Sequence, residues 1–164
     1  MLDLSASPCS CGAVFSPDRR YRYSLTRRFL DGGGTVLFIM LNPSTADESM
    51  NDPTIRRCLG FARRWGYHEC QAANLFAWVS SDPRDLCRLD IDPIGENDEH
   101  LHRLAVNASR IVCAWGNWGK LGGRSDVVRK MLSGYGAFCF GITNQGEPRH
   151  PLYLARNAKL EVLS

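Results

Sequence analysis

Apolar and polar residues alternate near the N-terminus of the chain, whereas apolar residues run together further along it. Residues 21–27 (YRYSLTR) alternate, which predicts a half-exposed β-strand. Runs that are apolar throughout predict strands covered on both faces, as in a parallel sheet. Such a strand is expected at residues 35–41, and further strands are expected at 69–76, 110–115 and 137–143.

Segments with apolar residues at helical spacing lie between these strands. The first follows Asp52-Pro53, a pair that suits a helix N-cap and first turn, and Gly66 supplies its end. Further helices are expected at 97–108 and 125–132, with a short one at 152–158. Strands that alternate with helices predict a sheet covered on both faces. The expected fold class is α/β, a three-layer α/β/α arrangement around a central, mostly parallel four-stranded sheet.

The length and composition suit a single compact domain. The chain has 164 residues, of which 44% are hydrophobic and 23% charged. We expect one domain over residues 1–164, with residues 1–30 forming an N-terminal β extension that carries a basic strand or hairpin. No apolar run reaches the roughly 18 residues that span a bilayer, and the N-terminus lacks a signal-peptide pattern. We therefore expect a soluble, cytoplasmic monomer with no membrane partner.

The cysteines do not predict a metal site or a disulfide framework. There are 7 of them, an odd number, and no signal peptide accompanies them. Cys113 and Cys139 lie in apolar strand-like runs, where a thiol acts as a small hydrophobe. Cys9 and Cys11 are the only close pair, and their spacing is shorter than zinc sites usually have. We expect no metal and no cofactor.

Arginines are concentrated in two segments of the chain, although the net charge is only +3. One group lies within residues 19–28, and the other, which includes Arg56, lies on the helix predicted after residue 52. Arginine clusters suit contacts with phosphates, although they also occur on ordinary solvated faces. The charge pattern therefore leaves nucleic-acid binding open.

Three short motifs follow predicted strands and carry most of the chemical information. They are LNPS at 41–44, ANLF at 73–76 and RHPL at 149–152. The carboxyl ends of parallel strands meet at one edge of a sheet, which is where ligands bind. Asparagine and histidine side chains at such an edge can hold a flat, hydrogen-bonding molecule. Each motif alone is as well explained by turn structure, but together they predict a site.

The residue types in these motifs suit the removal of a base from its sugar. Asn74 can read the donors and acceptors of a base edge, because its amide offers both. Asn42 can orient an attacking water, and His150 can stabilise negative charge on the departing base. Phe76 lies near the same edge and is a candidate for stacking on the base, although core packing explains it equally well.

These motifs resemble those of the DUF1643 family, a branch similar to the uracil-DNA glycosylase superfamily. The resemblance runs from Tyr21 to the C-terminus through LNPSTAD, NDPTIRRC, ANLFAW, GENDEHL and HPLYL. It implies a uracil-DNA glycosylase-like fold, with Asn42 handling the water, Asn74 binding a flipped base and His150 acting in catalysis. It also implies a wedge that enters the DNA stack, for which Leu152 or Tyr153 is the candidate. Arg149 and Arg56 are expected to contact the DNA.

The chain departs from the superfamily pattern at two positions that affect its chemistry. Asn42 replaces an aspartate, and an amide cannot accept a proton from water, so a nearby carboxylate is needed. Asp47 is our catalytic candidate and Asp52 the second, although helix capping explains Asp52 well. Ser44 occupies the place where uracil-specific members carry an aromatic residue that excludes 5-substituted pyrimidines. This implies a pocket that admits such bases.

The sequence thus predicts a monofunctional DNA glycosylase, because no lysine at the motifs could form a Schiff base. The expected substrate is a modified pyrimidine such as those of phage DNA, and a role in anti-phage defence or DNA repair would follow. Three other functions stay open: a hydrolase or transferase acting on free nucleosides or nucleotides, a module that recognises a modified base without excising it, and, ranked last, a zinc-dependent role through Cys9 and Cys11.

Overall fold

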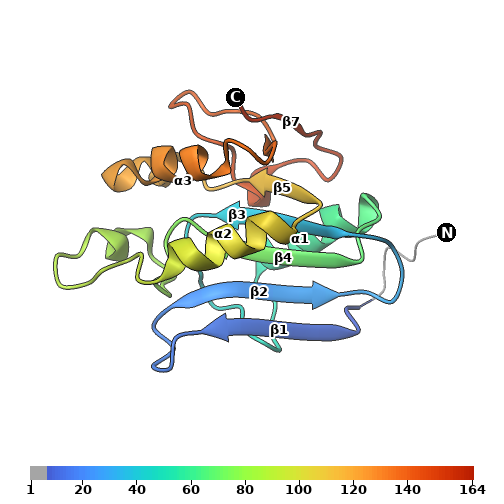
Figure 1. Cartoon of the computed structure of the whole chain (residues 1–164), viewed down its shortest axis with the longest axis horizontal. Coiled ribbons are helices and arrows are strands. Elements are labelled where there is room, and N and C mark those ends of the chain that lie inside the picture. The colour runs from blue at the N-terminus through green and yellow to red at the C-terminus, as the bar shows by residue number, and fades with distance from the viewer. Residues whose placement is uncertain (1–6) are drawn as a thin grey trace.

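A mixed seven-stranded sheet forms the centre of the molecule in the computed structural model, which describes residues 7–164 (Figure 1). The strand order across the sheet is β1-β2-β4-β3-β5-β6-β7. The strands are β1 Ser10–Phe15, β2 Arg22–Arg28, β3 Thr35–Met40, β4 Glu69–Asn74, β5 Arg110–Cys113, β6 Phe138–Cys139 and β7 Glu161–Val162.

The sheet is larger than the four-stranded one that the sequence predicts. The strands β4, β3, β5 and β6 run parallel at its centre. The hairpin of β1 and β2 adds antiparallel strands beside β4, and β7 adds one beside β6. The predicted N-terminal β extension is therefore part of the main sheet, because β2 pairs with β4 from Leu25 to Arg28.

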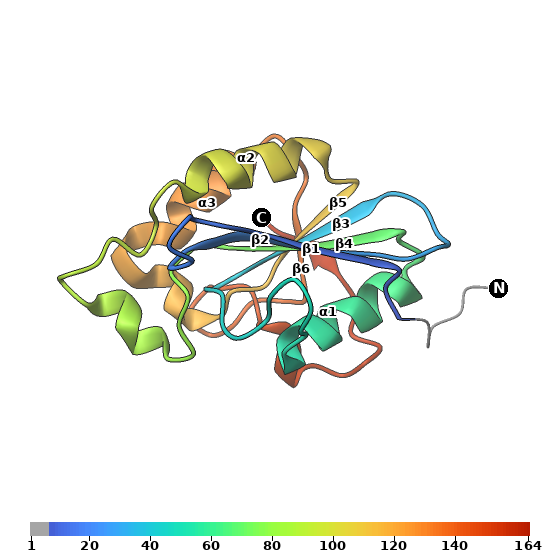
Figure 2. The same cartoon turned by 90° about the horizontal axis from the view of Figure 1, so that it is seen from below.

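Helices cover both faces of the sheet, as the alternation of strands and helices predicts. The helix α1 (Pro53–Arg64) lies on one face, and α2 (Asn97–Asn107) lies on the other (Figure 2). The helix α3 (Arg124–Leu132) packs into the same hydrophobic cluster as α2. Short 3-10 segments complete the chain: η1 Pro83–Cys87, η2 Asn117–Gly123 and η3 Pro151–Tyr153.

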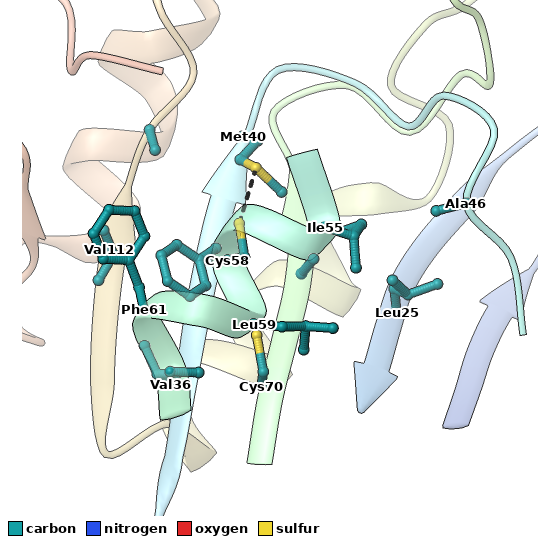
Figure 3. Close-up of a cluster of buried hydrophobic side chains, with 14 of the residues drawn as sticks. Leu25, Val36, Met40, Ala46, Ile55, Cys58, Leu59, Phe61, Cys70 and Val112 are labelled. Atoms are coloured by element: carbon teal, nitrogen blue, oxygen red, sulfur yellow. Dashed lines mark hydrogen bonds between the residues drawn. The ribbon is translucent and has the colours of Figure 1, made fainter. Parts of the chain in front are cut away.

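Two buried clusters hold the layers together, one on each side of the sheet. The first joins α1 to the sheet, and in Figure 3 the Cys58 thiol of α1 points towards Met40 at the end of β3. The sulfur atoms of Cys58 and Met40 are 3.7 Å apart. The second cluster joins α2 and α3 to the opposite face through residues such as Leu101 and Leu132. Both clusters anchor the strands whose ends carry the site.

Two predicted elements near the C-terminus differ in the structure. The helix expected at 152–158 is only the 3-10 turn η3, since the chain then turns away to form β7. The fourth parallel strand covers only Phe138–Cys139, because Gly141 with φ +94° turns the chain out of the strand. No helix within residues 7–164 combines the length and apolar character that crossing a membrane requires.

Candidate nucleobase site

The register of the parallel strands brings the first two motifs together. Met40 at the end of β3 pairs with Asn74 at the end of β4. On the other side of β3, Ile39 pairs with Cys113 at the end of β5. Asn42 and Trp115, two residues beyond Met40 and Cys113, therefore leave the same edge of the sheet as Asn74. The order β4-β3-β5 makes this edge a switch point between crossovers, the usual ligand position in such sheets.

A hairpin at residues 141–150 carries the third motif to this edge. His150 follows β6 only after this hairpin, which is closed by a bridge between Ile142 and Pro148. The Gly116 amide donates to the Pro148 carbonyl at 2.8 Å and so joins the hairpin to the chain after β5. His150 therefore reaches the site through contacts with the β5 loop and not directly from a strand end.

A cavity of about 380 Å³ opens where these segments meet, a volume typical of small-molecule sites. Asn42, Asn74 and His150 line it together, as the motifs predict. Ser44 and Tyr153 also line it. Asp52, the second carboxylate candidate, lines it as well. Residues outside the three motifs complete the lining, among them Arg22, Ser80, Ser81, Asn117 and Trp118.

Asn74 lines the cavity, and its side chain carries a hydrogen-bond donor that no described residue uses. Asn74 is only 2% exposed, and its Nδ2 atom is buried without a partner among the described residues. Its main-chain carbonyl accepts a hydrogen bond from the Asn97 amide at 2.7 Å, which fixes the backbone there. A buried donor left unpaired costs free energy, so a ligand that accepts a hydrogen bond is the natural partner for this amide.

The Asn42 amide is held in one orientation by the loop after β4. Its Nδ2 atom donates to the Ser80 carbonyl at 2.8 Å and to the Trp78 carbonyl at 3.4 Å. Its Oδ1 atom accepts no hydrogen bond from the described residues, so it can accept one from a water molecule or ligand in the cavity. The Asn42 side chain thus holds the loop after β4 through Nδ2 and keeps Oδ1 available as a hydrogen-bond acceptor.

His150 is held as a neutral imidazole that can donate into the cavity. Its Nδ1 atom accepts a hydrogen bond from the Leu152 amide at 3.3 Å, which leaves the proton on Nε2. Burial lowers the pKa of His150 below its ordinary 6.5, and the negative charge of Asp52 opposes this shift. At neutral pH the ring is therefore a neutral donor.

A buried cation and a carboxylate also line the cavity. Arg22 is 2% exposed; its Nη1 donates to the Ala46 carbonyl at 2.6 Å, and its buried Nε has no partner among the described residues. Burial lowers the pKa of Arg22 to about 10, and the charge of Asp52 opposes that shift. Asp52 caps α1 by accepting from the Ile55 amide at 2.8 Å through Oδ1, which leaves Oδ2 for the cavity.

Aromatic side chains form one wall and the mouth of the cavity. Trp115 is 1% exposed, and its indole donates to Glu147 at 2.6 Å. The residue at 119 must be glycine, because a Cβ there would lie 2.2 Å from Trp115 Cδ1. Trp118 and Tyr153 are 41% and 87% exposed, so their rings are accessible at the mouth.

The flank of the cavity beside Ser44 is lined by small polar side chains. The Ser44 hydroxyl lies 3.2 Å from that of Ser81, and Ser80 lines the cavity next to them. No aromatic side chain lies between Ser44 and the cavity in the described part of the chain, since Ser44 itself lines it. This flank of the cavity is therefore polar and carries only small side chains at these three positions.

Some residues that the sequence assigned to the site lie elsewhere. Asp47 does not line the cavity; its Oδ1 accepts from the Ser49 and Met50 amides and caps a turn. These hydrogen bonds lower the pKa of Asp47. Phe76 is 3% exposed and packs in the cluster beneath α2, where burial of its ring stabilises the core. Of the two candidate carboxylates, Asp52 therefore lines the cavity and Asp47 does not, and Phe76 lies in the core.

Of the four residues expected to contact DNA, only Tyr153 lines the cavity. Leu152 is half-buried, so Tyr153 is the better placed of the two wedge candidates. Arg149 is exposed on the 141–150 hairpin, and its Nε lies 3.5 Å from the Ile142 carbonyl. Arg56 is exposed on α1 and donates to the Asn51 carbonyl at 2.6 Å.

Asn97 has a role that its position at a helix start did not reveal. Asn97 begins α2, yet it is fully buried and its amide donates to the carbonyls of Asn74 and Leu75. It therefore ties α2 to the end of β4, directly behind Asn74. Within residues 7–164 all seven cysteines are unpaired, and no three side chains of the metal-binding types gather into a site.

Comparison with known proteins assigns a family to the chain. A family model described as "Protein of unknown function (DUF1643)" matches residues 22–152. The chain belongs to the DUF1643 family. No curated protein and no solved structure matches the chain. The DUF1643 match spans β2 to η3 and so includes Arg22, Asn42, Asn74 and His150. These comparisons do not link this DUF1643 protein to the uracil-DNA glycosylase superfamily.

Proposed function

We propose that this protein is a monofunctional DNA glycosylase that excises a 5-substituted pyrimidine and leaves an abasic site. The observation that carries the proposal is the unpaired, buried Nδ2 donor of Asn74, a residue that lines the cavity together with Asn42 and His150. A flipped pyrimidine presents acceptors to such a donor. The four central parallel strands with helices on both faces are compatible with the uracil-DNA glycosylase-like core that the motifs imply.

The proposed reaction breaks the bond between C1′ of the sugar and the base nitrogen. The bonding electrons leave with the base, and positive charge develops on the sugar ring as in other glycoside cleavages. His150 Nε2 donates to the base oxygen on which negative charge builds, and the Asp52 carboxylate stabilises the positive sugar. A water held by Asn42 Oδ1 then attacks C1′, and its proton ends on the departing base.

The products of this reaction are the free base and an abasic site with an intact strand. No lysine of the described chain lines the cavity, which agrees with a mechanism that uses water and forms no Schiff base. Ser44, Ser80 and Ser81 supply hydroxyls on one flank, so a 5-substituent that carries hydroxyl groups suits this flank best. The identity of the released base would distinguish a role in anti-phage defence from one in DNA repair.

An abasic-site assay tests the proposal directly. Oligonucleotides and phage DNA containing uracil, thymine mismatches, and hydroxymethylated or glucosylated cytosine would be incubated with the protein and then treated with alkali. We expect alkali-dependent breaks at a 5-substituted base, lost in Asn74→Ala and His150→Ala. The exposed residues Asn107 and His102 provide matched controls, and their alanine variants should retain activity.

The same assay separates two of the other functions. Base release from free nucleosides or nucleotides, but not from DNA, would favour the hydrolase or transferase. Tight binding of a modified oligonucleotide without any abasic product would favour a recognition module. Better cleavage of plain uracil than of every 5-substituted base would contradict the proposed specificity.

A further inference from the structure

Four arginines line a second hollow, which lies beside the cavity and which the proposed chemistry does not use. This arginine groove has a volume of about 440 Å³ and runs along α1 towards the C-terminal segment. Three of its arginines come from α1 and the fourth from the segment after η3: Arg56, Arg57, Arg64 and Arg156.

The charges of the arginine groove are not neutralised by the described part of the chain. Nine other arginines of residues 7–164 form ion pairs with Asp or Glu. The four groove arginines form none, and no acidic residue lines the groove. The hydrogen bonds found for them are donated to carbonyls, by Arg56 to Asn51 and by Arg57 to Pro151. Like charges repel, so a bound anion would stabilise this arrangement.

Gly60 gives the groove an open floor. It lies four residues after Arg56 and four before Arg64, so the three share one face of α1. Glycine in the middle of a helix destabilises it relative to alanine. A Cβ at Gly60 would meet nothing within 4 Å, so packing within the protein does not require glycine there. A ligand that approaches the helix backbone closely accounts for both observations.

The groove and the cavity share two structural elements. Asp52 lines the cavity, and the next residue, Pro53, lines the groove at the start of α1. Arg57 Nε lies 3.4 Å from the carbonyl of Pro151, which follows His150. An anionic chain that leaves the cavity mouth near His150 therefore meets the groove directly.

We propose that the arginine groove binds the phosphodiester backbone of the nucleic-acid strand whose base enters the cavity. Guanidinium groups suit phosphate oxygens because they donate paired hydrogen bonds. The identity of that strand as DNA rests on the proposed glycosylase function. The groove makes the substrate a polynucleotide, since a free nucleotide in the cavity would leave these arginines unused.

Binding of unmodified oligodeoxynucleotides, single-stranded and duplex, tests this proposal. Fluorescence anisotropy at several salt concentrations gives the slope of log K against log salt. In the Arg64→Gln/Arg156→Gln variant the slope should become shallower by about 0.7 to 0.9 for each arginine. The matched control Arg88→Gln/Arg103→Gln removes the same charge from exposed, ion-paired positions and should leave the slope unchanged.

A second variant distinguishes binding in the groove from a general effect of positive charge. Gly60→Gln fills the floor without altering any charge, and it should weaken binding several-fold while helix stability is kept or raised. A mononucleotide should displace the oligonucleotide only at much higher concentration. The proposal is overturned if the wild-type protein does not bind DNA, if both arginine pairs change the slope equally, or if a mononucleotide competes as well as the strand.

The two proposals fail separately. Groove-dependent DNA binding without base release on any substrate would remove the glycosylase function and retain the groove. Base release that is unaffected in the groove variants, with an unchanged salt slope, would retain the glycosylase function and remove the groove.

Discussion

The buried Glu147 carboxylate accepts a hydrogen bond from the Trp115 indole at 2.6 Å, and this contact fastens the 141–150 hairpin to the cavity wall. The other carboxylate oxygen accepts from the Ser125 hydroxyl at 3.1 Å. One acidic side chain thus connects the hairpin, the end of β5 and the start of α3. The position of His150 depends on this connection, because it lies at the end of the same hairpin.

Replacing Glu147 should destabilise the protein. Glu147→Ala leaves the buried Trp115 Nε1 without an acceptor, so we expect the free energy of unfolding to fall by about 1–3 kcal/mol. Glu147→Gln keeps one acceptor oxygen and should cost less. Chemical denaturation followed by indole fluorescence measures both, with Glu161→Ala on the exposed strand β7 as the control. Equal stability of Glu147→Ala and wild type would refute the fastening role.

Replacement of Asn74 by alanine should affect mainly activity, whereas the same replacement of Asn97 should affect mainly stability. Asn74→Ala removes a buried donor that has no partner, so its stability should stay within about 1 kcal/mol of wild type while base release is lost. Asn97→Ala removes the donor to the Asn74 carbonyl and should cost about 1–3 kcal/mol. Denaturation curves and the abasic-site assay on both variants check this. A large loss of stability in Asn74→Ala would assign it a structural role.

Much of the fold follows from local patterns in the sequence. The apolar run before Asn42 predicts β3, and the pair Asp52-Pro53 predicts the start of α1, because each signal acts over a few residues. The helix predicted for the C-terminal segment is wrong, because a long-range contact determines the structure there. Apolar residues at 152–158 suggest a helix, but the antiparallel pairing of β7 with β6 is a long-range contact that sequence periodicity does not reveal.

Site residues could be predicted from the sequence where they directly follow a strand. They could not be predicted where their place in the site depends on which side chains are buried. The positions of Asn42 and Asn74 at the site could be predicted from the ends of the strands alone. Arg22 lies in an alternating strand that predicts half exposure, yet the loop carrying Ala46 covers it and leaves it 2% exposed. Asp47 and Asp52 have similar sequence positions, and only the turn that Asp47 caps shows which carboxylate remains for the cavity.

Serine substitutions should distinguish the roles of the Asp52 and Asp47 carboxylates. Asp52→Ser keeps an N-cap side chain, so the stability of α1 should be nearly retained while base release falls strongly. Asp52→Ala loses the cap as well and should cost about 0.5–2 kcal/mol. Asp47→Ser lies outside the cavity and should keep full activity. Thermal denaturation and base release would be measured on all three. Loss of activity in Asp47→Ser with Asp52→Ser active would reverse the assignment.

His150 should make the stability of the protein depend on pH in a defined direction. Burial lowers its folded pKa below 6.5, so between these two pKa values the unfolded chain binds more protons than the folded one. The contribution of neutral His150 is therefore complete above about pH 6.5 and is lost as the pH falls towards the folded pKa. Wild-type protein should lose stability over this acidic range.

The variant His150→Gln isolates that contribution, because glutamine does not titrate. Its free energy of unfolding should fall less steeply between about pH 7 and about pH 5 than that of wild type. Part of the slope should remain, since burial and the charge of Arg103 also lower the pKa of His100. Urea denaturation at each pH measures the difference, and His100→Gln should reduce the remaining slope further. Parallel curves for wild type and His150→Gln would mean that folding does not shift the pKa of His150. The ring would then be partly protonated at pH values near 6.5, and the proposed mechanism could not rely on a neutral imidazole there.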